Sequence, residues 1–574
     1  MTTEPSTWDI LQSDVLIVGG GFAGLWAALR AAELGSSAIL VDKSFAGKSG
    51  HSFFASGARM VQLPEDNPDE YVREITLGNE WLVEQDMVSA IFEGSYARLR
   101  DLESFGLSFR KEKGSYTWTR ARGTQSVKNL WLDKATAADE VTILRKKALS
   151  RGVKFVDHVY VYDLVKNNEN AVAGAIGIGV KEQRNYIFKA KSVVLATNSG
   201  SYRGHHLACD LQGTGPFMAY DAGARLKNPE FHYINIRPAR HELEGSGILP
   251  AMGARWINGN GTHFMETYDP VLKDRAPSSK IVMAAAKEAM KGNAPITIDV
   301  RSMAEEERER FRVLMVSHGW QPILSEKCKR EEGYDILRDN IEWQPAYESN
   351  KLGIDADLEG KTTLPGLFAA GMARTLGINP FTGWSIASCT WSGYTAGESA
   401  ARHAMNEVSG DPDIDYASAS NRYRTFLEPL KKGSGVDPDD LVRMLQEILF
   451  PADVLIIMSE PRLKNALGQV LTLKTEKMDQ LRATETRGLI KARETRTMIL
   501  SAEMTLRAAL MRKETRENIF YREDFPAADN ANWLKWIIVQ KREDGEMDFS
   551  TREIPFETYT FKPGTYGRVQ ESVV

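Results

Sequence analysis

The glycine-rich stretch at residues 14–43, DVLIVGGGFAGLWAALRAAELGSSAILVDK, constrains the fold more than any other part of the chain. An apolar run ends in glycines, an Ala/Leu-rich helical pattern follows, and a second apolar run closes at Asp42. Gly19 allows a tight turn, Gly21 lets the backbone approach a pyrophosphate, and Gly24 lets helix and strand pack closely. The start of the helix attracts phosphates, and Asp42 is placed to accept bonds from ribose hydroxyls. The stretch therefore predicts a dinucleotide site on a Rossmann-like α/β fold.

Length and composition narrow the class of protein. The 574 residues predict three or four domain-sized units, and the net charge of −5 provides no global attraction for nucleic acid or anionic membranes. Three cysteines lie far apart without a CxxC pair, which excludes a ferredoxin-type cluster held by this chain alone. We expect the chain to bind no metal ion itself. The polar start lacks a secretory signal and no apolar run has membrane length, so we expect a cytoplasmic protein without an integral membrane segment.

Changes in amino-acid composition along the chain suggest where its domains begin and end. We expect a discontinuous nucleotide-binding domain, an inserted domain, a helical domain and a strand-rich tail, at residues 1–230 with 351–415, 231–350, 416–530 and 531–574. The insertion is inferred because a second strand-to-glycine turn, TTLPGLFAAG, follows at residues 362–371. The highly charged segment at residues 474–500 is expected to form a helix whose charged face is solvated.

Further segments of small residues indicate other contacts with the nucleotide. They are the loop KSFAGKSGHSFFASGA at residues 43–58, the strand end ATNSG at 196–200, the glycine turn at 371 and the helix pattern after it. We expect the cofactor to be bound by Gly19, Gly21, Phe22, Ala23, Gly24, Asp42, Lys43, Ser49, Gly50, His51, Ser52, Ala196, Thr197, Gly200, Gly371, Ser385 and Ile386.

Four motifs in order, GGGFAG, SGHSFFASGA, GTGPFMAYDAGA and PGLFAAG, resemble the flavoprotein subunits of the succinate dehydrogenase and fumarate reductase superfamily. This superfamily includes L-aspartate oxidase and the alpha subunit of adenylylsulfate reductase. The C-terminal MRKETRENIFYREDFPAADNANWLKW is similar to the end of their helical domain. The resemblance covers nearly the whole chain. It implies an FAD-binding domain, an inserted α+β capping domain, a C-terminal helical domain, and hydride transfer as the chemistry.

Within the superfamily, NPEFHYINIRPARHELEGSG at residues 228–247 is most similar to the adenylylsulfate reductase branch. By that match, Arg240 lies nearest the substrate, with Arg237 beside it. An arginine suits an anionic substrate or the charge that develops during hydride transfer. His232 and Tyr233 precede this loop and are candidates for proton transfer.

Departures from the family pattern limit the substrate. The dicarboxylate-reducing relatives carry an arginine in an ARDVV-like helix start and another in an NRLGANSL-like loop. Here these stretches, residues 278–289 and 377–386, contain no arginine, and a substrate histidine becomes Glu348 or Tyr347. Succinate and fumarate are therefore not expected. The HKFSS-like stretch of adenylylsulfate reductase also becomes NPFTGWS, so sulfur chemistry is not assumed.

The resemblance implies a small substrate that exchanges hydride with flavin N5, and a ferredoxin-like iron–sulfur partner that carries the electrons. We expect FAD to be bound without a covalent bond; attachment through His51 is the alternative, because one branch has a flavin-linked histidine there. Other readings stay open: a self-sufficient oxidase like L-aspartate oxidase, a flavoprotein that acts on RNA, and a non-catalytic electron carrier. The basic segment at residues 464–496 is the only support for RNA, and no binding of nucleic acid is expected.

Overall fold

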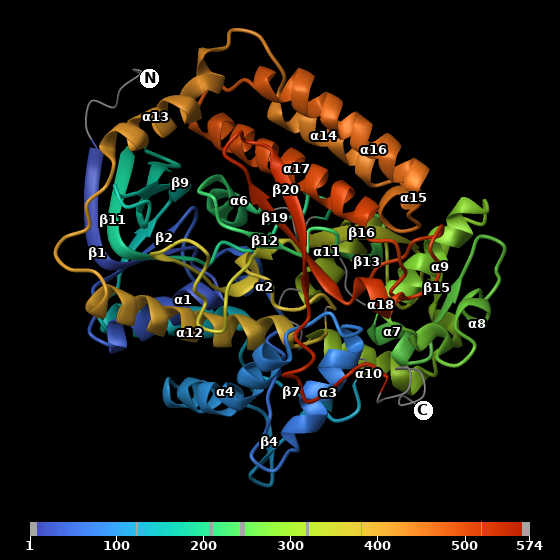
Figure 1. Ribbon diagram of the computed structural model, residues 1–574. Helices are drawn as coiled ribbons and strands as arrows, with labels where there is room; N and C mark the ends of the chain where they lie inside the picture. Colours follow the sequence, from blue (N-terminus) through green and yellow to red (C-terminus); the bar gives the residue numbers. More distant parts are fainter. Residues whose placement is uncertain are drawn as a thin grey trace.

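The computed structural model describes residues 8–121, 124–182, 184–205, 211–240, 247–316, 321–379, 381–517 and 519–564 (Figure 1). Within these residues the largest sheet has seven strands in the order β8-β2-β1-β11-β10-β9, with β18 added to β11. Strand β10 pairs antiparallel with both of its neighbours, β9 and β11, and the other neighbouring strands pair in parallel. This arrangement confirms the predicted Rossmann-like α/β fold. The strands are β1 (Trp8–Val18), β2 (Ala38–Asp42), β8 (Lys154–Asp157), β9 (Val159–Lys166), β10 (Val172–Gly179), β11 (Asn185–Leu195) and β18 (Leu367–Ala369).

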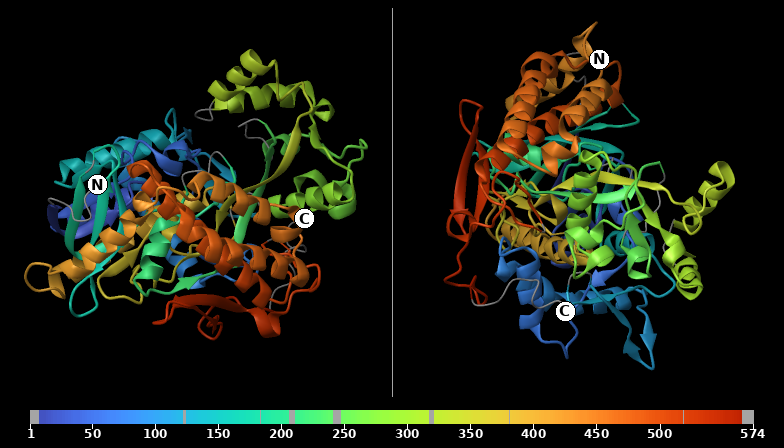
Figure 2. Two further views of the ribbon diagram at one scale, coloured as in Figure 1. Left: turned by 90° about the horizontal axis from the view of Figure 1, so that it is seen from above. Right: turned by 90° about the vertical axis from the view of Figure 1, so that its right-hand side faces the viewer.

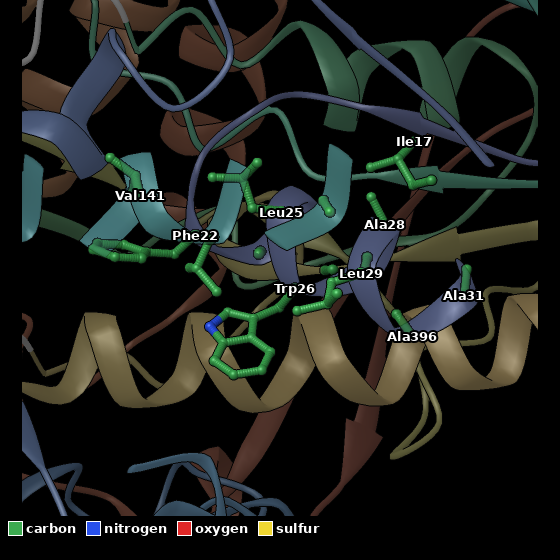
Figure 3. Close-up of a cluster of buried hydrophobic side chains, with 14 of the residues drawn as sticks. Ile17, Phe22, Leu25, Trp26, Ala28, Leu29, Ala31, Val141 and Ala396 are labelled. Atoms are coloured by element: carbon green, nitrogen blue, oxygen red, sulfur yellow. The ribbon is translucent and has the colours of Figure 1, made fainter. Parts of the chain in front are cut away.

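Helix α1 (Phe22–Glu33) packs between this sheet and the long helix α12 (Trp384–Asn406). Trp26 and Leu29 of α1 point toward α12 in Figure 3. A Cβ on Gly393 of α12 would lie 2.3 Å from the carbonyl oxygen of Ala23. Because glycines on α12 face the backbone of α1, the two helices approach more closely than larger side chains would allow.

The segment between β2 and β8 adds a helical layer and two small sheets beside α12. In Figure 1 its helices α3 and α4 lie below α12. The elements are α2 (Gly50–Phe54), β3 (Arg59–Met60), α3 (Pro68–Gly78), α4 (Gln85–Ser104), β4 (Lys111–Glu112), β5 (Ser115–Tyr116), β6 (Trp118–Arg120), β7 (Lys128–Leu130) and α5 (Ala137–Ser150).

The inserted segment forms a four-stranded antiparallel sheet in the order β13-β16-β15-β14, with a core of its own. Helix α9 packs on β13 and β16. We call this unit the cap; Figure 2 shows it extending away from the main sheet. Its elements are β13 (His232–Pro238), α7 (Ile248–Ala251), β14 (Arg255–Ile257), α8 (Met265–Tyr268), α9 (Ser278–Met290), β15 (Ile296–Asp299), α10 (Glu305–Val316), α11 (Gln321–Glu332) and β16 (Glu342–Asn350).

A helical domain follows α12, as the resemblance implied. Helices α14, α16 and α17 lie side by side (Figure 1). Helix α17 corrects one expectation, because it is largely buried rather than a solvated face: Glu494 is 5% and Glu503 1% exposed. Glu503 accepts a hydrogen bond from Lys474 at 2.8 Å, and such pairing is what allows a carboxylate to be buried. The helices are α13 (Tyr416–Leu427), α14 (Pro438–Leu449), α15 (Ala452–Leu455), α16 (Glu460–Thr472) and α17 (Thr486–Met511).

The tail forms a hairpin around Asp544-Gly545, with strands β19 (Lys535–Lys541) and β20 (Met547–Glu553). Strand β19 also pairs with β12 (Leu226–Lys227), which in turn pairs with β17 (Gly353–Ile354). The tail thus completes a sheet with strands that flank the cap. Every helix among the described residues is too short or too polar to cross a membrane.

A buried ionic network joins three regions at the end of α17. Arg512 donates to Glu230 at 2.9 Å and to Glu514 at 2.6 Å, and Arg516 donates to Glu514 at 2.9 Å. Arg512 also donates to the carbonyl of Lys535 at 2.7 Å, at the start of β19. Charges this deeply buried are tolerated because each has a partner of opposite sign. The network holds the helical domain, the tail and the strand leading to the cap together.

We predict that Arg512→Met lowers the free energy of unfolding by about 3–5 kcal/mol, because the buried carboxylates of Glu230 and Glu514 lose the positive charge that pairs with them. Chemical denaturation followed by circular dichroism measures the change. The matched control is Arg443→Met on α14, whose side chain is 72% exposed and paired with Asp440. It should cost about 0–1 kcal/mol. Equal effects of the two substitutions would contradict a supporting role for the network.

Candidate functional site

The turn between β1 and α1 depends on glycines that tolerate no side chain. Gly19 has a φ of +108°, and a Cβ on it would lie 2.4 Å from the carbonyl oxygen of Ala196. A Cβ on Gly24 would lie 1.8 Å from the carbonyl oxygen of Gly19. Both distances are well inside van der Waals contact, so the turn, the helix and β11 can meet only where side chains are absent.

The start of α1 is open toward an acceptor. Gly21 is the N-cap residue of α1. Because it has no side chain, the N-cap residue itself accepts no hydrogen bond from the N–H groups of the first turn. The N–H of Phe22 donates to Ser52 Oγ at 3.1 Å, so Ser52 of α2 lies at the place where a phosphate would meet the helix dipole. Ala23 is buried one residue further along and lies against α12.

Asp42 closes β2 beside this turn. Its Oδ2 accepts from the N–H of Gly20 at 2.7 Å, and its Oδ1 accepts from the N–H of Ser44 at 2.7 Å. Burial raises the pKa of the Asp42 carboxyl, and the two backbone hydrogen bonds oppose this effect. Each oxygen keeps a lone pair, so Asp42 can still accept a bond from a ribose hydroxyl.

The carboxyl end of β11 forms the opposite wall. Ala196 and Thr197 are half-buried, whereas residues 192–195 directly before them are buried. Thr197 Oγ1 is inaccessible to solvent and has no hydrogen-bond partner within the described residues. A Cβ on Gly215 would lie 1.9 Å from this oxygen, so the hydroxyl packs against Gly215. Gly200 ends this wall and is buried.

Helix α12 contributes a second helix start. Its N-cap is Gly383, with a φ of +83° and no side-chain cap, so the N–H groups of Ser385 and Ile386 have no acceptor within the helix. Gly371 has a φ of +61°, and a Cβ on it would lie 2.7 Å from the Cβ of Ala23. We call the start of α1 with the ends of β1, β2 and β11 the nucleotide groove. The start of α12 lies further along, where Gly383 meets Met60 of β3 and Asn129 of β7.

The remaining predicted cofactor residues lie around α2 and β2. Ser49 is the N-cap residue of α2, where its hydroxyl donates to the carbonyl of Phe45 at 3.0 Å, and Gly50 begins the helix. His51 is exposed and precedes Ser52. Lys43 is exposed and pairs with Glu494 of α17 at 3.5 Å. Covalent attachment of the flavin through His51 stays a prediction.

The residues of the groove fit FAD. Glycines form a cradle that a single Cβ would fill. Two helix starts offer N–H groups to anionic oxygens, and Asp42 offers carboxylate oxygens beside the cradle. When bound, FAD would supply a two-electron redox centre there.

One face of the cap sheet is polar. Tyr233, Asn235 and Arg237 alternate along β13 with Ile234 and Ile236, which pack on the core of the cap, so these three side chains lie on the opposite face. Arg237 donates from Nε to Glu348 at 2.6 Å and pairs through Nη2 with the same carboxylate oxygen at 2.5 Å. Glu348 reaches this face because the register of β13 and β16 shifts between Tyr233 and Ile234.

The polar face is joined to the nucleotide groove by one pair of residues. The N–H of Asn350 donates to the carbonyl of Gly200 at 2.8 Å, and Asn350 Oδ1 accepts from the N–H of Gly200 at 3.1 Å. Glu348 therefore lies two residues from the groove wall, and Arg237 is paired with it. Arg237 is thus paired with Glu348 on the face that also carries Tyr233, and the catalytic roles of these three residues stay predictions.

Lys351 is a charged residue of this region that the sequence analysis missed. It follows Asn350, and its N–H donates to the carbonyl of Phe231 at 2.8 Å. Its ammonium lies 5.6 Å from the centre of the Tyr233 ring. Burial lowers the pKa of Lys351 to about 8, and the nearby Glu348 carboxylate opposes that shift. No motif marks a lysine at this position, so only the pairing of β13 with β16 could identify it.

His232 lies on the other face of the sheet. Its Nε2 is 2.8 Å from the carbonyl of Leu455 in α15, and its ring stacks on Tyr347 with centroids 5.6 Å apart. Desolvation lowers the pKa of His232 to about 4, so the ring is neutral at pH 7. His232 therefore links the cap to the helical domain. Its role in proton transfer stays a prediction.

Arg240 is exposed at the end of β13, beside a cavity of about 460 Å³. The cavity lies between the cap and the helical domain, and its wall combines polar and apolar groups. It is lined by Gly204, His205, Ile234, Arg237, Pro238, Ala239, Arg240, Gln344, Pro345, Ala346, Tyr347, Leu449, Phe450, Pro451, Leu455 and Ile456.

The helix start where dicarboxylate-reducing relatives have an arginine is neutral here. Ser278 begins α9, and its Oγ lies 2.6 Å from Asn235 Oδ1 on the polar face. Lys280, two residues on, is paired with Asp269 at 3.1 Å. Positive charge at the polar face includes Arg237, which is paired with Glu348, and Lys351.

We predict that Gly24→Ala abolishes FAD binding, because the new Cβ would overlap the Gly19 carbonyl and open the phosphate turn. The ratio of flavin to protein absorbance in the purified chain measures this. Gly468→Ala on α16 is the matched control, since a Cβ there meets nothing within 4 Å. A yellow Gly24→Ala protein with full flavin content would refute this account of the turn.

Comparisons with known proteins agree with this geometry. A model described as "FAD binding domain" matches residues 14–385, and one described as "Fumarate reductase flavoprotein C-term" matches residues 443–567. One subunit of the fumarate reductase (CoM/CoB) of Methanothermobacter marburgensis is 26% identical, over 94% of this chain and 99% of that protein. The fumarate reductase flavoprotein subunit of Escherichia coli is 24% identical, over 97% of this chain and 96% of that protein.

Solved structures share the whole fold. A quinol fumarate reductase chain of E. coli superposes with a TM-score of 0.84 at 22% identity, covering 98% of this chain and 99% of that one. Adenylylsulfate reductase of Archaeoglobus fulgidus gives 0.79 at 23% identity, covering 95% and 96%. Because both branches lie at similar identity, the branch nearest to this chain stays a prediction. The matched family models show that the chain belongs to the succinate dehydrogenase and fumarate reductase flavoprotein family, and it is an FAD-dependent oxidoreductase.

Proposed function

We propose that this flavoprotein transfers hydride between a small anionic substrate and flavin N5, in the space between the polar face of the cap and the nucleotide groove. The observation that carries the proposal is the bond pair between Asn350 and Gly200, which joins the groove wall to the strand bearing Glu348. An FAD-binding fold with a polar, charged surface this close to the groove suits chemistry on a polar molecule.

The charged groups have distinct roles in this proposal. Glu348 holds the guanidinium of Arg237 in place, and the pair together is neutral. Arg240 is exposed and can turn its side chain toward an anionic group. The first-turn N–H groups of Ser385 and Ile386 would stabilise negative charge on the reduced ring.

The charge on the polar face argues for a substrate with one anionic group. The relatives that reduce dicarboxylates use arginines at stretches that here contain none, and Ser278 is hydrogen-bonded to Asn235 instead. Two carboxylates brought onto this face would face Lys351 and an arginine already paired with Glu348. Desolvating the second carboxylate would then be uncompensated.

Electrons must leave or enter the flavin by another route, and we propose that a ferredoxin-like iron–sulfur subunit is the partner. The cysteines do not offer cluster ligands: Cys328 is buried, and burial raises the pKa of Cys389 to about 12. The third, Cys209, lies outside the described residues. A cytoplasmic location stays a prediction from composition.

Two alternatives lose support. An RNA-binding role needs accessible cations, yet Lys464, Lys474, Lys491, Arg493 and Arg496 of the basic segment are each paired with a carboxylate. A purely electron-carrying subunit would favour an apolar space beside the flavin, whereas the cap turns Tyr233, Asn235 and the Arg237–Glu348 pair onto its polar face.

The purified holoprotein should lose its flavin colour when mixed under anaerobic conditions with one class of compound in a panel of hydroxy acids, amino acids, amines and sulfur anions. Absorbance in the visible flavin band measures this. Admitting air then separates two outcomes: slow reoxidation supports an iron–sulfur partner, and rapid reoxidation identifies a self-sufficient oxidase of the L-aspartate oxidase type. Persistent colour with every compound would count against hydride transfer from a small substrate.

Arg240→Met should raise KM for the active compound by about 10- to 100-fold, because a charge-assisted hydrogen bond to the substrate is lost. Steady-state kinetics measure the effect. Arg301→Met is the control, since Arg301 is also an arginine of the cap but 70% exposed and paired with Asp299. An unchanged KM in the Arg240 variant would remove Arg240 from the binding site.

A further inference from the structure

Lys351 directly follows β16, in the segment where the chain returns from the cap to the FAD-binding domain. We call this segment, together with the one that leads into the cap, the hinge. The two chain segments that connect cap and FAD-binding domain run side by side there, because the N–H of Lys351 donates to the carbonyl of Phe231 at 2.8 Å. The preceding residue, Asn350, is bonded to Gly200 in the groove wall. Lys351 therefore lies where the polar face of the cap meets the nucleotide groove.

The surroundings of Lys351 leave its amine available. Within the described part of the chain, Lys351 Nζ makes no direct hydrogen bond or ion pair, and the nearest ring is Tyr233 at 5.6 Å. The neighbouring carboxylate, Glu348, is already engaged by Arg237. The side chain is half-buried.

We propose that Lys351 is the proton-transfer group of the reaction, and that the substrate is an acid whose reacting carbon carries a hydroxyl or an amino group. This inference rests on the function proposed above. As the substrate is oxidised, its C–H bond breaks and the hydride passes to flavin N5. The proton of the adjacent O–H or N–H passes to the neutral amine of Lys351, and a C=O or C=N bond forms. In the reverse direction the ammonium of Lys351 returns the proton.

Electrostatics support this assignment. Burial lowers the pKa of Lys351 to about 8, so the amine can gain and lose a proton near neutral pH, as an acid–base catalyst requires. The charged groups around it are Glu348 on β16, which opposes the shift, and Arg237 on β13, which is neutralised by Glu348. His232 is on the opposite face and is held by Leu455, whereas Tyr233 and Glu348 share the polar face with Lys351.

The first test needs no substrate. The FAD-loaded chain is treated with trace acetic anhydride over a series of pH values from about 6 to about 11, which spans the titration of ordinary lysines, and the acetylation of individual lysines is read by peptide mass spectrometry. We expect half-maximal reactivity of Lys351 near pH 8, and a higher midpoint for the exposed Lys291, whose hydrogen bonds with Tyr268 and Glu288 raise its pKa. Equal profiles for the two lysines would overturn the proposal even if a substrate has been found.

The second test separates charge from proton transfer. Lys351→Arg keeps the positive charge but cannot release its proton, and Lys351→Met loses both. With the active hydroxy or amino acid, both variants should reduce their flavin about 100-fold more slowly than the wild type. In the wild type the rate should rise with pH through about 8, because only the neutral amine accepts a proton, and both variants should lose this rise.

Controls make the outcome decisive. Both variants should keep full FAD content, because Lys351 lies outside the glycine turn that holds the nucleotide. Lys351→Met should also keep or raise the melting temperature, since removing a half-buried ammonium that forms no ion pair relieves desolvation. Loss of FAD from both would make Lys351 a structural residue and overturn the proposal, as would flavin reduction at the wild-type rate with the same pH dependence. If no panel compound reduces the flavin, the proposed function fails, while the acetylation profile still decides whether Lys351 is a poised base.

Discussion

Contact between backbone and backbone is the constraint on which this structure depends. Gly24 of α1 meets the carbonyl of Gly19, and Gly393 and Gly397 of α12 meet the carbonyls of Ala23 and Ala27. Because no side chains stand between them, α1 lies tightly between β1 and α12. The same tight packing holds the start of α1 at the ends of the parallel strands, where its dipole and free N–H groups create a site for an anionic nucleotide.

The cap depends on this arrangement at its hinge. Its two connecting segments leave and rejoin the FAD-binding domain as neighbours, and Asn350 bonds the return segment to Gly200 of the groove wall. The alternation of β13 then separates two surfaces. Ile234 and Ile236 form the core of the cap, and Tyr233, Asn235 and Arg237 lie on the other face with Glu348. One short strand thus both stabilises the cap and supplies its chemistry.

Buried charges connect the more distant parts. Glu230, which precedes the hinge, is held by Arg512 at the end of α17, and Arg512 also bonds the carbonyl that begins β19. The tail in turn pairs with β12 and, through it, with β17, the strands on either side of the cap. Helical domain and tail therefore support the hinge rather than form separate bodies. Desolvated ions enforce this geometry because any loosening leaves a charge unpaired.

The amino-acid sequence by itself determined the phosphate turn, Asp42 and the order of the FAD-binding segments, because these depend on local spacing: a strand, a glycine turn and a helix within about thirty residues. It also showed that the arginines of the dicarboxylate-reducing relatives are missing. It could not show that α17 is buried, since its charges look solvated until their partners on other helices are known. Tertiary structure alone decided that His232 and Tyr233, adjacent in the chain, serve opposite faces, and that Lys351 joins Arg237 and Glu348. Arg237 and Glu348 are 111 residues apart along the chain, and only the register of β13 with β16 brings them together.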